Sequence, residues 1–400
     1  MDKIRKLLFE IKKRGLYPDI KVIESAPYPV VIINGKKILM FGSYNYLGLS
    51  VRPEIRQAAI DAIKKYGIGS GGSRLISGTY DIHIELEKEL ANFKVEEDAM
   101  VLSSGFGTNA GVIPAIINMF DLTKYKRWFN QDVIFSDELN HASIIDGCKL
   151  SHSYDVVYKH KDINDLEHKL SKYRKRRKLI VTDTVFSMDG DIAPLDKIVN
   201  LAKEYHAMVM VDDAHATGIL GEHGGGGSDY FKLEGAIAIN MGTSKTFGAL
   251  GGFIAGSKDL IDYLRIACRS YMFATSMPPV IAATILAAIK IIKAEPELRV
   301  KINSNAAYLR DNLQKMGFDT LGSETPIVPV LLGSENKAIK AFQFFFDKGI
   351  FAPTVRWPAV GRGKSRIRFV TTATHTREDL DRLLETCCEV DKILDIPKKL

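Results

Sequence analysis

Short apolar runs alternate with helical patterns through the middle of the chain. Six runs predict strands: AMVLSS, DVIFSD, KLIVTDTVF, AMVMVDDAH, AIAINMG and GGFIAGS. Strands buried on both faces are apolar along their whole length, and their alternation with helices is typical of a parallel sheet. The pattern therefore predicts an α/β fold with a mainly parallel central sheet.

The two ends of the chain follow other patterns. Residues 1–15 predict a charged amphipathic helix, and residues 29–41 predict two strands around the turn Asn34-Gly35. Towards the C-terminus, three helical segments alternate with the strand patterns TPIVPVLL and SRIRFVTTA, which predicts a smaller α+β domain. We expect an N-terminal segment over 1–44, a large domain over 45–290 and a small C-terminal domain over 291–400.

The composition is ordinary for a globular protein, with 400 residues, 46% hydrophobic and 26% charged. No apolar run approaches the roughly 18–20 residues of a membrane helix. The N-terminus is charged throughout and lacks the features of a signal peptide, so we expect a cytoplasmic protein. The four cysteines lack metal-ligand spacing, which predicts reduced thiols and no metal site; they are Cys148, Cys268, Cys387 and Cys388.

The net charge of +7 comes largely from a basic run over residues 172–178. Such a run can bind nucleic acid, but here it follows a helical pattern and precedes a predicted strand. Cations are favourable at a helix C-terminus, so we expect a solvated helix end and no nucleic-acid partner. Attraction of an anionic substrate is the alternative.

Three segments at the ends of predicted strands carry candidate chemistry, where open α/β sheets bind their ligands. Residues 103–111, SSGFGTNAG, place free backbone amides at a helix start, which suits a phosphate. Residues 211–218, VDDAHATG, end a strand with an aspartate that needs a partner when buried. Residues 241–252, MGTSKTFGALGG, hold a lysine among small residues, where a lowered pKa would allow a Schiff base.

Each segment alone has a plainer explanation: a glycine turn, a helix cap or salt bridge, and a surface lysine. Together, and in this order, they predict that Lys245 holds pyridoxal 5′-phosphate (PLP) as a Schiff base.

The chain also resembles the α-oxoamine synthase family of fold-type I PLP enzymes. The resemblance covers nearly the whole chain and rests on SYNYLGLS, GSGGSRLISGTYDIH, SSGFGTNAG, DELNHASIIDGC, VTDTVFSMDGD, VDDAHATGILGEHG, TSKTFG and SRIRF. It implies a homodimeric PLP-dependent transferase with its active site at the subunit interface.

The resemblance also implies roles for individual residues. Lys245 is the Schiff-base lysine, Asp212 pairs with the pyridine nitrogen, and His141 stacks on the ring; these three form the expected catalytic set. His215 and Ser187 lie near the phenolic oxygen.

The remaining implied contacts are with phosphate and substrate. The phosphate contacts the amides of Gly105 and Phe106, while Asn45 and Arg368 hold the substrate carboxylate. Thr275 or Ser276 reaches the partner's phosphate. The family usually has Thr-x-x-Lys before the Schiff base, but Thr243-Ser244-Lys245 is one residue shorter, so either hydroxyl is a candidate phosphate ligand.

The implied reaction is decarboxylative condensation of a small L-amino acid with an acyl thioester, carried by coenzyme A or a carrier protein, to give an α-amino ketone. Segments near the cofactor favour L-alanine with a pimeloyl thioester. The flanks GLYPDIKVIES, SETPIVPVLLG and WPAVGRG favour L-serine with a long acyl chain. The pimeloyl-using pattern usually has a threonine where Ala359 stands and an arginine near residues 19–21. Glycine acylation ranks third, and a PLP aminotransferase is the alternative from another class.

Overall fold

The computed structural model describes residues 1–17, 19–119, 132–233, 238–242 and 245–399, and the backbone alone over 238–242. A seven-stranded sheet forms the largest layer, in the order β3-β9-β8-β7-β6-β4-β5. Only the pairings of β9 with β3 and β8 are antiparallel, so the predicted mainly parallel sheet is confirmed. The strands are β3 (Asp98–Leu102), β4 (Val133–Asp137), β5 (Tyr154–Tyr158), β6 (Lys178–Asp183), β7 (Met208–Asp212), β8 (Ala238–Gly242) and β9 (Gly252–Gly256).

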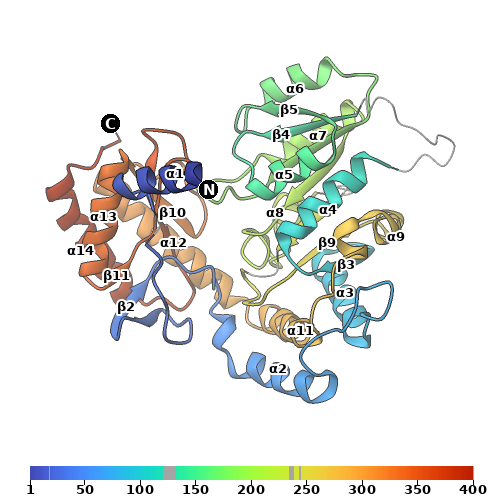
Figure 1. Cartoon of the computed structure of the whole chain (residues 1–400), viewed down its shortest axis with the longest axis horizontal. Helices are drawn as coiled ribbons and strands as arrows, with labels where there is room; N and C mark the ends of the chain where they lie inside the picture. The colour runs from blue at the N-terminus through green and yellow to red at the C-terminus, as the bar shows by residue number, and fades with distance from the viewer. Residues whose placement is uncertain (18, 120–131, 234–237, 243–244, 400) are drawn as a thin grey trace.

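Helices cover both faces of this sheet (Figure 1). The buried residues of β3, β4, β6 and β7 contribute to two separate clusters, one on each face, as expected for strands without a solvated side. The helices of this part are α2 (Pro53–Tyr66), α3 (Asp81–Lys94), α4 (Gly105–Ile117), α5 (Ala142–Leu150), α6 (Ile163–Ser171), α7 (Leu195–Glu204), α8 (Gly227–Phe231), α9 (Lys258–Ala267), α10 (Arg269–Met272) and α11 (Pro279–Ala294).

The C-terminal region builds a second core with two three-stranded sheets, β10-β13-β12 and β1-β2-β11. The hairpin of β1 and β2 turns at Asn34 and Gly35, both with positive φ, as predicted. Strand β2 pairs in parallel with β11, which joins the N-terminal segment to the C-terminal region. The elements are β1 (Val30–Ile33), β2 (Lys36–Met40), β10 (Ile327–Gly333), β11 (Ile350–Phe351), β12 (Thr354–Val355), β13 (Ser365–Val370), α12 (Glu297–Lys315), α13 (Glu335–Asp347) and α14 (Arg377–Leu394). The bounds of the three domains stay a prediction.

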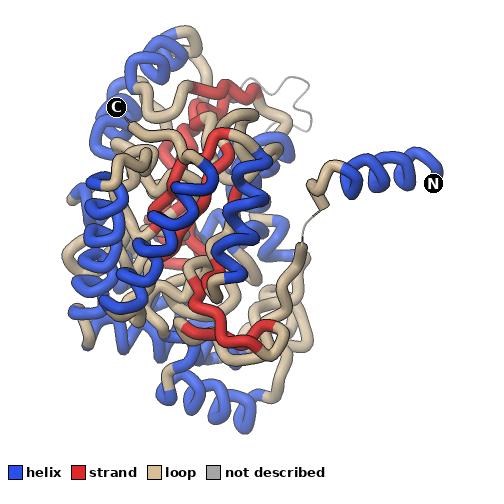
Figure 2. Tube along the Cα trace, turned by 90° about the vertical axis from the view of Figure 1, so that its left-hand side faces the viewer, coloured by secondary structure: helices blue, strands red, loops and turns tan. Residues whose placement is uncertain are grey.

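Helix α1 (Asp2–Lys13) forms where predicted but buries none of its side chains, and it stands apart from the rest of the chain (Figure 2). A short 3-10 helix, η1 (Leu49–Val51), precedes α2. Within the described residues, no helix is long and apolar enough to cross a membrane.

Two features differ from the sequence expectations. Strand β5 was not among the predicted strands, because it is a sheet edge with charged and exposed residues. The expected solvated helix end is wrong for Lys178, which is buried in β6, where its ammonium donates to the carbonyl of Arg176 at 2.8 Å. Arg177 pairs with Asp132 at 2.7 Å. Part of the basic run therefore caps the turn that leads into the sheet.

Candidate active site

Three strands of the large sheet end in an aspartate at the same edge. Asp137 closes β4, Asp183 closes β6 and Asp212 closes β7, and Asp183 lies directly beside Asp212 in the strand register. All three are buried. The carboxyl ends of parallel strands share one edge of a sheet, so this edge gathers the acidic groups of the site.

Asp212 is held by two hydrogen bonds. The side-chain amide of Asn109 donates to its Oδ2 at 2.7 Å, and the backbone amide of Ala214 donates to its Oδ1 at 2.9 Å. Burial and the neighbouring Asp212 raise the pKa of Asp183 well above its ordinary value. Because two adjacent buried carboxyls resist double ionisation, the charge of Asp212 favours the protonated form of Asp183.

Lys245 follows strand β8 in the sequence and lies close enough to Asp212 to interact with its charge. Burial lowers the pKa of its ammonium to about 8, although the charges of Asp212 and Asp183 act in the opposite direction. Its Nζ lies 5.6 Å from the centre of the Tyr44 ring. A lysine with a lowered pKa supplies the neutral amine that attacks an aldehyde.

His141 begins helix α5 as its N-cap. Its backbone amide donates to Oδ2 of Asp183 at 2.8 Å, and its Nδ1 accepts the amide of Ser143 at 3.3 Å. Burial lowers the pKa of the imidazole, so the ring is neutral near pH 7. An uncharged ring held at a strand end suits the predicted stacking role.

His215 is buried against Tyr46, with 2.6 Å between its Nδ1 and the tyrosine hydroxyl. Burial raises the pKa of Tyr46 and lowers that of His215, so a neutral phenol faces a neutral imidazole. A phenol that donates to Nδ1 leaves the proton of His215 on Nε2. Nε2 is then a hydrogen-bond donor for an oxygen in the site.

The predicted phosphate-binding site is the first turn of α4. Ser104 caps the helix, and its Oγ accepts the amide of Gly107 at 3.0 Å. The amides of Gly105 and Phe106 belong to this first turn, where N–H groups have no intrahelical partner. Thr243 and Ser244 lie outside the described residues, so the shortened Thr-Ser-Lys spacing stays untested.

Thr275 and Ser276 differ in what they can reach. Ser276 is buried, and its hydroxyl donates to the carbonyl of Gly78 at 2.6 Å, which ties it to the loop over residues 70–78. Thr275 is exposed. Of the two hydroxyls predicted to reach a partner subunit, only that of Thr275 is at the surface.

The substrate side of the site centres on Arg368 in β13. Its guanidinium donates to the carbonyl of Ser187 at 2.9 Å and to the hydroxyl of Tyr44, and it lies 4.9 Å from the Tyr44 ring centre. Arg368 is buried, and it contributes to the lowered pKa values of both His215 and Lys245. The arginine predicted to bind a carboxylate therefore lies in the same site as the predicted cofactor residues.

Asn45 has backbone partners instead of a free amide. Its Nδ2 donates to the carbonyl of Pro27 at 3.2 Å, and its Oδ1 accepts the amide of Ser50 at 3.2 Å. Its role in substrate binding stays a prediction. Ser187 contributes its carbonyl to Arg368, and its predicted contact with the cofactor is also untested.

Known proteins resemble this chain along its whole length. Residues 36–386 match the family model described as aminotransferase class I and II. An 8-amino-7-oxononanoate synthase from Thermoanaerobacter pseudethanolicus is 46% identical over 399 residues, covering 99% of this chain and 98% of the relative.

The chain belongs to the α-oxoamine synthases within the class I and II aminotransferase family.

Solved α-oxoamine synthases share its fold. Serine palmitoyltransferase from Sphingomonas wittichii superposes with a TM-score of 0.91 at 31% identity, covering 99% of both chains. The enzyme from S. paucimobilis, solved with a PLP–myriocin aldimine, has a TM-score of 0.90 at 31% identity and covers 98% of both chains. The predicted family and fold-type I architecture are confirmed. These relatives are named as one synthase and two serine palmitoyltransferases, whereas the matching family model is named for aminotransferases.

Sequence reasoning missed several residues of this α-oxoamine synthase site. Asn109 lies one helical turn after Gly105 on α4, and Asp183 ends a strand just as Asp212 does, so both had a signal in the sequence. Tyr44 and Tyr46 lie within SYNYLGLS. Their partners, Arg368 and His215, are far away along the chain, so only the fold reveals the pairing.

Proposed function

We propose that this α-oxoamine synthase is an 8-amino-7-oxononanoate synthase, which condenses L-alanine with a pimeloyl thioester and releases CO₂ in the biotin pathway. The observation that carries the proposal is the full-length relative at 46% identity. The solved serine palmitoyltransferases are 31% identical, which ranks L-serine with a long-chain acyl-CoA second. Glycine acylation ranks below both.

The residues of the site fit PLP. Asp212 offers a fixed carboxylate for a protonated ring nitrogen, and Lys245 offers an amine of lowered pKa for the aldehyde. The first turn of α4 suits the phosphate, and Nε2 of His215 can donate to the phenolic oxygen. When bound, PLP supplies an electron sink for the charge that develops at the α-carbon of the amino acid.

Residues of the chain bind the substrate, transfer the proton and orient the ring. Arg368 binds the substrate carboxylate, because its planar fork gives two parallel hydrogen bonds. Lys245 Nζ takes the proton from the α-carbon, since burial keeps its pKa near 8 and therefore near neutral operating conditions. Asn109 and Ala214 hold the Asp212 carboxylate in place, where it would pair with the ring nitrogen and keep that nitrogen protonated.

The structure shows fewer candidate binding groups for the acyl chain than for the amino acid. A pimeloyl chain ends in a carboxylate or its ester, which favours a basic partner. Lys21, the nearest substitute for the missing arginine, already pairs with Asp19 at 2.5 Å and lies 4.5 Å from the Phe346 ring centre. The pimeloyl part of the proposal therefore rests on the relatives rather than on Lys21.

The partners of the reaction are a small amino acid and an acyl thioester on coenzyme A or a carrier protein. We infer a homodimer in the cytoplasm, with Thr275 directed to the phosphate of the partner subunit. Exposure of Thr275 beside a buried Ser276 supports this arrangement.

A substrate panel tests the proposal. Glycine, L-alanine and L-serine are each paired with acetyl-, pimeloyl- and palmitoyl-CoA and with a pimeloyl carrier protein, and ketone products are identified by mass. We expect kcat/KM for alanine with a pimeloyl donor to exceed every other pair by about tenfold or more. If serine with palmitoyl-CoA is preferred, the substrate assignment is wrong and the family assignment stands. If no pair gives a ketone, the proposed reaction is wrong.

A further inference from the structure

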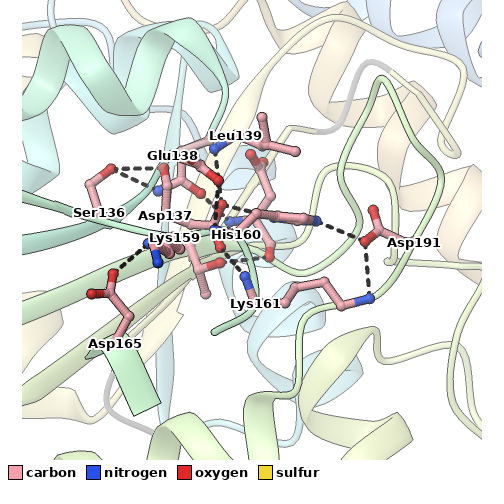
Figure 3. A network of polar contacts seen from close by, with 12 residues as sticks. Ser136, Asp137, Glu138, Leu139, Lys159, His160, Lys161, Asp165 and Asp191 are labelled. Carbon is pink, nitrogen blue, oxygen red and sulfur yellow. Dashed lines mark hydrogen bonds and ion pairs between the residues drawn. The ribbon is translucent and has the colours of Figure 1, made fainter. Parts of the chain in front are cut away.

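A histidine outside the site described above bridges two loops that carry site residues. His160 follows the edge strand β5, and dashed lines in Figure 3 join its side chain to Asp137 and Asp191. Its Nδ1 lies 2.9 Å from Oδ1 of Asp137, and its Nε2 lies 2.8 Å from Oδ2 of Asp191. Asp137 starts the loop that leads to His141, and Asp191 closes the loop that carries Ser187.

Both ring nitrogens of His160 face carboxylate oxygens, so both must carry a proton. A neutral imidazole would turn a lone pair against one of the two carboxylates. Burial alone would lower the pKa of His160, but the hydrogen bonds to Asp137 and Asp191 outweigh it and raise the pKa to about 9. The same interactions keep the pKa of Asp191 below its ordinary value despite burial.

The other groups around His160 complete this network. Oε1 of Glu138 accepts the backbone amide of His160 at 2.9 Å. The backbone amide of Lys161 donates to Asp137 at 2.9 Å, and its ammonium lies 3.0 Å from Asp191. The Phe186 ring packs edge-on against the imidazole, with 4.4 Å between ring centres. Three acids and one further cation therefore face the ring or its backbone, which favours the protonated form.

The loop closed by Asp191 is a tight turn. The amide of Gly190 donates to the carbonyl of Phe186 at 2.8 Å, and the amide of Phe186 donates to the carbonyl of Asp191 at 3.1 Å. A Cβ at Gly190 would lie 2.1 Å from the carbonyl oxygen of Ile327, so the turn packs closely against β10. A shift of Asp191 would move this turn as a unit.

That turn contacts the arginines of β13. The carbonyl of Ser187 accepts the guanidinium of Arg368, and Asp189 pairs with Arg366. The other loop is equally fixed, because the amide of His141 donates to Asp183 and Asn140 donates to the carbonyl of Val181 at 2.8 Å. His160 and Lys161 both link the two loops, and the His160 side chain contacts both aspartates directly.

We propose that His160 is a positioning residue whose imidazolium joins the two loops and, through the Ser187 turn, holds Arg368 in place for the substrate carboxylate. This role rests on the proposed function, because it assigns the carboxylate to Arg368. His160 touches neither Arg368 nor the residues around Asp212 directly, so its effect passes through Asp191 and the turn.

The test compares His160→Gln with His168→Gln, which replaces an exposed histidine on the neighbouring helix α6. In the PLP-loaded enzyme, His160→Gln should raise KM for the amino acid by about tenfold, while KM for the acyl thioester stays within about twofold. His168→Gln should change neither. A purely structural role would lower activity with both substrates alike, and equal losses would overturn the proposal.

The pH dependence adds a second readout. The pKa of His160 is raised in the folded chain, so the bridge is complete below about pH 6.5 and is lost as pH rises through about 9. The ratio of the amino-acid KM of His160→Gln to that of the wild type should therefore be largest at pH 7 and below, and it should fall towards one as pH rises through about 9. A ratio that is constant with pH would contradict the proposal.

Two measurements need no substrate and separate this proposal from the proposed function. In ¹⁵N-histidine NMR spectra, the resonance missing from His160→Gln should show both nitrogens protonated at pH 8. Asp191→Asn, which keeps the histidine, should lower that pKa and speed hydrogen exchange over residues 186–191. An ordinary histidine pKa near 6.5 in the wild type, or unchanged exchange in Asp191→Asn, would overturn the proposal even if every substrate assay fails.

Discussion

The cofactor side and the substrate side of this site are built in different ways. On the cofactor side, Asp183 and Asp212 end strands of one sheet and Lys245 follows another strand of it. Helices that follow strands of the same sheet carry their partners Asn109 and His141. On the substrate side, Arg368 from β13 meets Tyr44, 324 residues away along the chain, and Ser187 from the turn that follows β6. One sheet positions the residues of the cofactor side, whereas the positions of the substrate-side residues depend on how distant parts of the chain pack together.

This difference predicts that the two sides fail in different ways. Changes on the cofactor side should abolish the chemistry for every substrate. Changes on the substrate side should weaken amino-acid binding and leave the cofactor in place.

Lys245→Ala should have the largest effect. It removes the amine that captures the cofactor and the base that takes the α-proton, so turnover should fall by at least about ten-thousandfold and the Schiff-base absorbance should vanish. Both are read from absorbance spectra and steady-state rates. Product formed near the wild-type rate would show that another residue holds the cofactor.

Asp212→Asn should lower kcat by about a thousandfold while PLP remains bound, because an amide cannot keep the ring nitrogen protonated. Equilibrium dialysis measures retention of the cofactor, and stopped-flow absorbance measures the chemical step. Asp196→Asn, on the exposed start of α7, is the matched control. A variant with unchanged proton abstraction would disprove the role of Asp212.

Asp213, the next residue along the chain, should act on stability instead. Its buried carboxylate lies 2.6 Å from the ammonium of Lys94, which is also fully buried, and it accepts the amide of Gly227 at 3.1 Å. Asp213→Ala leaves Lys94 unpaired and should destabilise the fold by about 3–5 kcal/mol. Thermal unfolding measures the loss, and Lys94→Met in the same background should recover part of it. An unchanged midpoint for Asp213→Ala would contradict the buried pair.

Arg368→Lys should have the smallest effect of the four. An ammonium replaces the bidentate fork, so KM for the amino acid should rise by about ten- to a hundredfold with normal cofactor absorbance. Arg366→Lys, which alters the adjacent pair with Asp189, is the comparison variant. If Arg368→Lys instead releases the cofactor, the two sides are not separable as described.

The sequence predicted the cofactor side better because its signals are local. Apolar strands followed by Asp212 or by Lys245 are visible within short segments, and the family motifs cover them. The pairing of Tyr46 with His215 and the bridge made by His160 involve segments far apart in the sequence or ordinary surface patterns, so no spacing reveals them. Likewise, the sequence did not predict edge strand β5, because its polar residues resemble a loop. It did not predict that Lys178 is buried, because the basic run resembles a solvated helix end. The hydroxyls of Thr243 and Ser244 were predicted from the family, and they lie outside the described residues.

Carbon labelling tests the central claim most directly. The enzyme is supplied with L-[1-¹³C]alanine and pimeloyl-CoA, and ¹³CO₂, free coenzyme A and 8-amino-7-oxononanoate are measured together. Decarboxylative condensation predicts all three in equal amounts, with no label in the ketone. In a parallel reaction that also contains a 2-oxo acid as amino acceptor, labelled pyruvate without release of coenzyme A would show an aminotransferase and would contradict the account.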